Sequence, residues 1–212
     1  MVSASFSLQS LINASSVHML SIATGAVAGL VTVGVLRGAS TVMGPANLSI
    51  TAVQSIVLRR LAGYAARSHR SRWRDLLGDA VLTSAVFAAI AAVLAVGAHF
   101  LGDLILGPEV WQAVQPILLL VAADGVLVAI TTVARLFHRA TWEHKRSMAI
   151  SLVFVSARWP AVLSAAAMYG AMGAALGALV SSLIGAVLWW YSAYRVSRDL
   201  PEEPAISSTR IS

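Results

Sequence analysis

Two charged side chains interrupt long apolar stretches of the sequence, where an ionised group needs a specific reason to be present. Asp124 interrupts the apolar run that ends at Arg135, and Arg158 interrupts the run that follows Arg146. A charge inside the hydrocarbon of a bilayer costs about 2.5–3.5 kcal/mol or more, so such groups pair with one another or serve a function. We therefore predict an intramembrane ion pair between Asp124 and Arg158.

The depths of these two residues match if basic residues mark one membrane face. Asp124 is eleven residues from Arg135, and Arg158 is twelve residues from Arg146. At 1.5 Å per residue, both lie roughly 17–18 Å from that face, near the bilayer midplane. Two interpretations stay open. The pair joins two antiparallel helices structurally, or it presents a cation to an anionic substrate or a carboxylate that titrates.

A second set of polar residues shares one helical face, because its members are spaced i, i+4, i+7 and i+8. These residues are Asn47, Thr51, Gln54 and Ser55. Amides that face lipid lack hydrogen-bond partners, so this face must meet other helices or a water-filled cavity. Both outcomes stay open, since polar side chains also join helices within membrane bundles.

The sequence contains no recognisable catalytic or metal-binding motif. It has no cysteine, which excludes thiolate zinc sites and cysteine nucleophiles. The H-E-x-x-H, G-x-S-x-G and G-x-x-x-x-G-K-[ST] patterns are also absent. His69, His138 and His144 lie in basic segments and are expected to face solvent or lipid headgroups. We expect neither an enzyme nor a metal site nor a cofactor.

The elements that must position these residues are membrane-spanning helices. Hydrophobic residues make up 58% of the 212 residues and charged residues 11%, less than half the charged share of a typical soluble domain. About six stretches are long and apolar enough to cross a bilayer as helices, and they lack the period of two expected in a barrel. They cover residues 15–36, 44–62, 78–100, 114–135, 147–168 and 171–194.

Basic residues alternate between the segments that join these spans. They gather between the second and third spans, between the fourth and fifth, and after the sixth, whereas the segments after the third and fifth spans have none. Basic segments mark the cytoplasmic side, so both termini are predicted to be cytoplasmic. The same placement explains the net charge of +6 by membrane orientation and anionic headgroups, so we expect no nucleic-acid partner.

Three parts make up the expected domain organisation. Residues 1–14 form a short uncharged leader, residues 15–198 the transmembrane domain, and residues 199–212 a disordered cytoplasmic tail. Inside the last span, small residues repeat every four positions, which predicts close approach of helix backbones. They are Gly173, Gly177, Ser181 and Gly185.

Several short motifs follow one another in an order that matches this topology. Arg37-Gly38-Ala39 precedes Gly44-Pro45-Ala46-Asn47, and Val57-Leu58-Arg59-Arg60-Leu61-Ala62 ends the second span. In order and spacing they resemble the R-A-A, G-P-x-N and L-P-R-L-A-R motifs of the polysaccharide-export flippases of the MATE-like superfamily. Arg59 stands where that family has proline. The resemblance covers about residues 15–198 and includes weaker matches further along, namely Leu101-Gly102, Leu106-Gly107, Trp111, Arg139-Ala140, Arg146, Gly170 and Gly173-Ala174-Ala175.

This resemblance implies a transporter of the bacterial inner membrane. Members of the family flip undecaprenyl-linked sugars to the outer leaflet through a polar cavity between two six-helix lobes. This chain resembles the C-terminal lobe alone, so a second copy or a separate chain would supply the other lobe. The resemblance makes Arg37 and Arg158 the candidate anion contacts and the polar face of the second span the cavity wall. Arg37 has a simpler interpretation as an anchor at the outer interface.

Three other functions remain open at this stage. The first is the membrane subunit of an ABC-type exporter, for which residues 67–77 would form a cytoplasmic coupling helix. The second is a scaffold for polysaccharide synthesis that transports nothing. The third is an intramembrane enzyme, which the missing nucleophile–base pairs disfavour.

Overall fold

The computed structural model describes residues 18–62 and 68–200. Within them, 95% of the residues are helical and there are no strands, which confirms the all-α prediction. The predicted leader and most of the predicted tail lie outside the described residues, as does Arg67 at the start of the proposed coupling helix.

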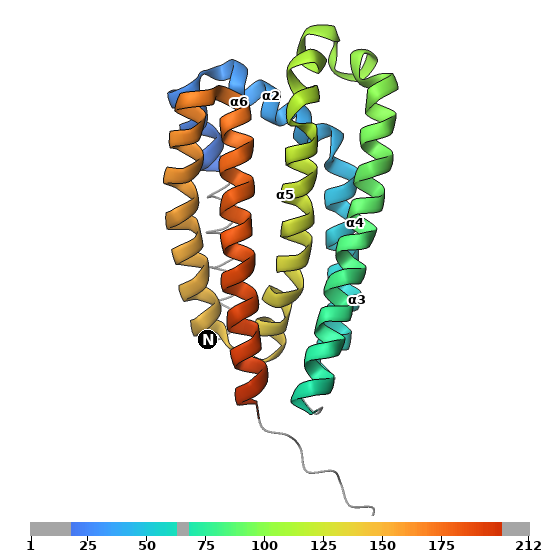
Figure 1. Cartoon of the computed structure of the whole chain (residues 1–212), viewed down its shortest axis with the longest axis vertical. Coiled ribbons are helices and arrows are strands. Elements are labelled where there is room, and N and C mark those ends of the chain that lie inside the picture. The colour runs from blue at the N-terminus through green and yellow to red at the C-terminus, as the bar shows by residue number, and fades with distance from the viewer. Residues whose placement is uncertain (1–17, 63–67, 201–212) are drawn as a thin grey trace, which may run out of the picture.

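The long helices run up and down along one long axis (Figure 1). A short helix, His18–Ala28, comes first. It is followed by α2 (Leu30–Val42), α3 (Gly44–Ala62), α4 (His69–Leu106), α5 (Pro108–Ala140) and α6 (His144–Asp199). The predicted span over residues 44–62 coincides with α3, whereas α4 and α5 extend well beyond their predicted spans.

The predicted continuous helix over residues 15–36 is wrong, because the chain breaks at Gly29. This residue has φ 87° and ψ 161°, a conformation that side-chain-bearing residues rarely adopt. After this break α2 runs to Val42 and meets α3 at an angle of 56°. The first apolar stretch therefore forms two helices rather than one.

Helix α6 is two helical arms joined by a sharp kink. Gly170 has φ 59° and ψ −135°, outside the helical region, and the chain reverses there so that the arms lie side by side (Figure 1). We call residues 144–169 the first arm and residues 171–199 the second arm. The predicted spans over residues 147–168 and 171–194 fall on these two arms.

The stripe of small residues lies where the two arms meet, as the sequence predicted. A Cβ atom on Gly173 would collide with the backbone carbonyl of Ala165, and one on Gly177 would lie 2.8 Å from the carbonyl oxygen of Ala161. Glycine therefore permits a backbone approach that any larger residue would prevent.

Three helices of the described part, α4, α5 and α6, are long and apolar enough to cross a membrane. The number rises to four if the bent pair of α2 and α3 forms one span. Large apolar side chains such as Leu30, Leu104 and Leu119 are at least three-quarters exposed, which suits contact with lipid rather than water. These features indicate a membrane-embedded protein.

Basic residues gather at one end of the bundle, where α3 ends, α4 begins, α5 ends, the first arm of α6 begins and the second arm ends. We call this the basic end. Side-chain contacts join its helices. Arg60 lies 2.8 Å from the nearly buried Asp79 of α4. Trp73 of α4 packs edge-to-face on Trp190 and Tyr194 of the second arm. The basic end is thus a packed part of the fold.

The coupling helix considered for residues 67–77 is not a separate element, because residues 69–77 form the first turns of α4. Arg72 in this stretch is fully buried and donates to the backbone carbonyl of Ser197 at 2.8 Å. His69 contacts the Ser197 hydroxyl at 3.0 Å. Tertiary contacts with the second arm explain why this polar stretch is helical.

Candidate functional site

The structure brings Asp124 and Arg158 together. Arg158 Nη2 lies 3.7 Å from Asp124 Oδ2, and Arg158 Nη1 donates to Ser182 Oγ at 3.0 Å. The same guanidinium lies 5.5 Å from the centre of the Phe154 ring. Because Ser182 belongs to the second arm and Asp124 to α5, Arg158 contacts both neighbours of the first arm.

The Asp124–Arg158 contact leaves both groups incompletely satisfied. A charge-assisted hydrogen bond between such groups is about 2.7–2.9 Å long, and this contact is longer. Asp124 Oδ1 is buried and has no hydrogen-bond partner among the described residues. Arg158 therefore keeps donor capacity that a second anion could use.

A cavity of about 240 Å³ lies beside this pair, between α5, the two arms of α6 and the first short helix. Its α5 wall is a single helical face, since Val128, Thr131 and Arg135 follow Asp124 at intervals of four, seven and eleven residues. The lining residues are Leu20, Val128, Thr131, Arg135, Phe154, Val155, Arg158, Trp159, Ser182, Gly185 and Trp189.

Arg135 is the second cation of the cavity. Its guanidinium lies 5.6 Å from the centre of the Trp189 ring, a cation–π contact that holds the charge without neutralising it. Within the described residues it forms no ion pair, and no Asp or Glu lines the cavity. Two guanidinium groups can bind one phosphate or carboxylate through several hydrogen bonds, so the cavity suits an anion.

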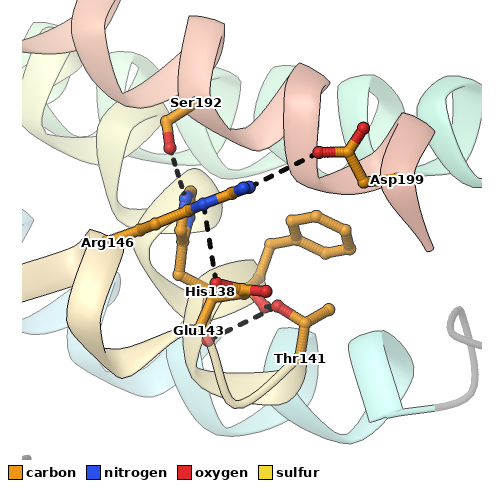
Figure 2. Close-up of polar contacts among 7 residues, drawn as sticks. His138, Thr141, Glu143, Arg146, Ser192 and Asp199 are labelled. Carbon is orange, nitrogen blue, oxygen red and sulfur yellow. Dashed lines mark hydrogen bonds and ion pairs between the residues drawn. The ribbon is translucent and has the colours of Figure 1, made fainter.

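His138 packs against Trp189, which lines the cavity. The expectation that His138 faces solvent or lipid headgroups is wrong. It is fully buried and packs edge-to-face on Trp189 at 5.3 Å. Its Nδ1 lies 2.8 Å from the Ala134 carbonyl oxygen, which can only accept, so Nδ1 carries a proton. Its Nε2 lies 2.9 Å from Ser192 Oγ, a contact drawn in Figure 2. The residue is buried because α5 continues to Ala140, past the end of the predicted span.

The other predicted site residues lie elsewhere. Arg37 is exposed on α2 and lines a separate cavity with residues of the first short helix. On α3, Gln54 is partly exposed and the rest of the predicted polar face is exposed, namely Asn47, Thr51 and Ser55. None of these five residues lines the cavity at Arg158.

Sequence reasoning missed Arg135 as a site residue and used it only as a marker of the membrane face. A signal was present, because Arg135 lies on the same helical face as Asp124 three turns away. The contribution of Trp189 could not be found in this way, since it comes from a helix that is distant in sequence.

Among the described residues, no three His, Asp or Glu side chains lie close enough to hold a metal ion. Comparisons with protein-family models, curated proteins and solved structures find no match to this chain. The fold and the site thus define a helical, membrane-embedded protein with a cationic cavity between its helices.

Proposed function

We propose that this protein moves an anionic, lipid-linked sugar across the membrane, as the flippases that its motifs resemble do. One observation carries the proposal: Arg135 and Arg158 line one cavity, and no acidic side chain of the described residues lines it with them. Arg135 has no ion-pair partner among the described residues, and Asp124 neutralises Arg158 only in part. Such cations are costly in hydrocarbon unless an anion binds them.

The two arginines suit a substrate that must pass through hydrocarbon with its phosphate charged. Arg135 lies near the basic end and Arg158 lies deeper, so an anion can pass from the first guanidinium to the second. Asp124 neutralises part of the Arg158 charge when the cavity is empty. A substrate phosphate that displaces this contact favours the loaded conformation, which is the differential affinity that alternating access requires.

The proposal includes six crossings of a bacterial inner membrane, with the basic end in the cytoplasm. Each arm of α6 exceeds the roughly 20 residues that a crossing needs. The polar face of α3 remains exposed in the single chain, and such a face requires polar neighbours in a membrane. We propose that a second lobe, supplied by a second copy or another chain, covers this face.

Reconstitution in vesicles tests the proposal. The purified chain is placed in liposomes with a fluorescent polyprenyl-pyrophosphate sugar, and a membrane-impermeant quencher reports how fast the label changes leaflets. We expect Arg158→Gln and Arg135→Gln each to slow this exchange about tenfold, the effect of roughly 1.4 kcal/mol. The matched control is Arg59→Gln, because Arg59 is exposed at the end of α3.

Two results would overturn the proposal. The first is exchange no faster than in vesicles without protein. The second is equal slowing by Arg59→Gln and by the two cavity variants, which would reflect loss of positive charge in general.

A further inference from the structure

A second hollow, of about 560 Å³, lies at the basic end between the two arms of α6. It is separate from the cavity at Arg158, since the two share no lining residue. We call it the arm groove. Its lining residues are Arg146, Ala149, Ile150, Val153, Leu188, Tyr191, Ser192, Arg195, Arg198 and Asp199.

The polar part of the arm groove has an excess of positive charge. Three arginines line it, with Asp199 as the single acid among its described lining residues. Arg146 Nη1 lies 3.6 Å from Asp199 Oδ2, and Arg198 Nε lies 3.9 Å from Asp199 Oδ1. One carboxylate is therefore shared between two guanidinium groups, and neither contact has the length of a hydrogen bond.

The remaining partners do not remove this excess. Arg146 Nε lies 3.8 Å from Glu143, which is outside the groove lining, and Figure 2 shows Arg146 between Glu143 and Asp199. Arg195 lies 5.0 Å from the centre of the exposed Tyr191 ring. It forms no ion pair within the described part of the chain. Arg195 therefore offers its donors to a ligand.

The other half of the arm groove is apolar. Ala149, Ile150 and Val153 follow Arg146 along one face of the first arm, and Leu188 of the second arm lies opposite. Val153 is 59% exposed. Along the arms, the groove changes from cationic near their ends to apolar one to two turns further in, which matches an amphipathic ligand with an anionic head.

We infer that the arm groove binds an anionic phospholipid, with the headgroup phosphate at Arg146, Arg195 and Arg198 and an acyl chain along Val153 and Leu188. Basic pockets between transmembrane helices recognise anionic headgroups in this way. The aromatic ring of Tyr191 belongs at the same level, the boundary between headgroups and hydrocarbon. The inference requires a membrane-embedded chain, but it does not depend on what the protein transports.

Lipid retention on the purified full-length chain tests the inference. The protein is incubated in detergent with equal amounts of phosphatidylglycerol and phosphatidylcholine, and bound lipid is counted by native mass spectrometry. We expect at least fivefold more phosphatidylglycerol than phosphatidylcholine on the natural chain. The variant Arg146→Gln/Arg195→Gln/Arg198→Gln should lose this preference, and Arg195→Gln alone should reduce it without disturbing the fold, because Arg195 is exposed.

The matched control removes the same charge elsewhere at the basic end. Arg59→Gln/Arg70→Gln/Arg74→Gln changes three exposed arginines of α3 and α4 and should keep the preference. Loss of the preference in this control, or its persistence in the groove variants, would overturn the inference. Displacement of the lipid by millimolar inorganic phosphate would also overturn it, because the groove would then take a soluble anion.

Discussion

The guanidinium of Arg158 lies 3.7 Å from the Asp124 carboxylate and donates to Ser182 at 3.0 Å, so one side chain links α5 to both arms of α6. These contacts agree with the structural interpretation of the pair, and its role toward a substrate stays a prediction. The pair joins helices, and it also places a partly neutralised cation on the wall of a cavity.

The strength of this link can be measured with a double-mutant cycle. We expect Asp124→Asn and Arg158→Gln each to destabilise the protein, because each leaves the other charge without its partner in a poorly hydrated site. The two changes together should cost less than their sum, with a coupling of roughly 0.5–3 kcal/mol. Thermal unfolding in detergent of the four chains gives the coupling, and purely additive effects would show that the residues do not interact.

Filling the cavity should stop transport while both arginines remain. Thr131 lines the cavity between Val128 and Arg135, and its hydroxyl donates to the backbone carbonyl of Leu127, one turn earlier. We expect Thr131→Leu to slow leaflet exchange about as much as Arg158→Gln, with a destabilisation no larger than the roughly 1–3 kcal/mol that a larger side chain costs in a packed core. The matched control is Thr41→Leu, because Thr41 makes the same backbone bond on an exposed part of α2.

If Thr131→Leu slows leaflet exchange no more than Thr41→Leu does, the substrate does not pass through the cavity. The anion would then have to travel along another surface of the protein.

The close contact between the arms of α6 predicts that a larger side chain there lowers the stability of the protein. We expect Gly177→Ala to destabilise the protein by about 1–3 kcal/mol, because the new Cβ would press on the Ala161 carbonyl oxygen. Gly97→Ala in α4 is the matched control. A Cβ there meets no atom within 4 Å, so the gain in helix propensity should leave stability unchanged or slightly raised. Equal melting temperatures for the two variants would contradict the observed packing.

The proposed topology can be tested by labelling, since the natural chain has no cysteine. We expect Arg74→Cys and Arg198→Cys to react only from the cytoplasm, and Glu109→Cys and Tyr169→Cys only from outside. All four positions are exposed in the structure. Labelling of Tyr169→Cys from the cytoplasm would show that the arms of α6 do not form two crossings.

Much of the fold follows from hydrophobicity, because a segment that crosses lipid must be apolar along its length. The bounds of α3 and the small-residue contacts between the arms agree with the predictions. The break at Gly29 was missed because glycine also occurs inside membrane helices, as Gly97 does here. Only the backbone conformation distinguishes the two cases.

The burial of His138 and Arg72 was missed for a different reason. An apolar stretch indicates how much of a helix contacts hydrocarbon, whereas the helix itself continues as long as neighbours satisfy its polar side chains. Ser192 and Ser197 provide these contacts from the second arm. They are far away in sequence, so no local pattern reveals them. The contact between Arg135 and Trp189 was missed for the same reason, because the two residues are far apart in sequence.

The leaflet on which lipid-linked sugars reside in cells tests whether this chain moves them, as we propose. Polyprenyl-linked oligosaccharides are extracted from a strain lacking the protein, and the leaflet on which they reside is determined. We expect accumulation on the cytoplasmic leaflet, reversed by the natural chain but not by Arg135→Gln/Arg158→Gln. An unchanged leaflet distribution in the strain without the protein would show that this chain does not move these sugars.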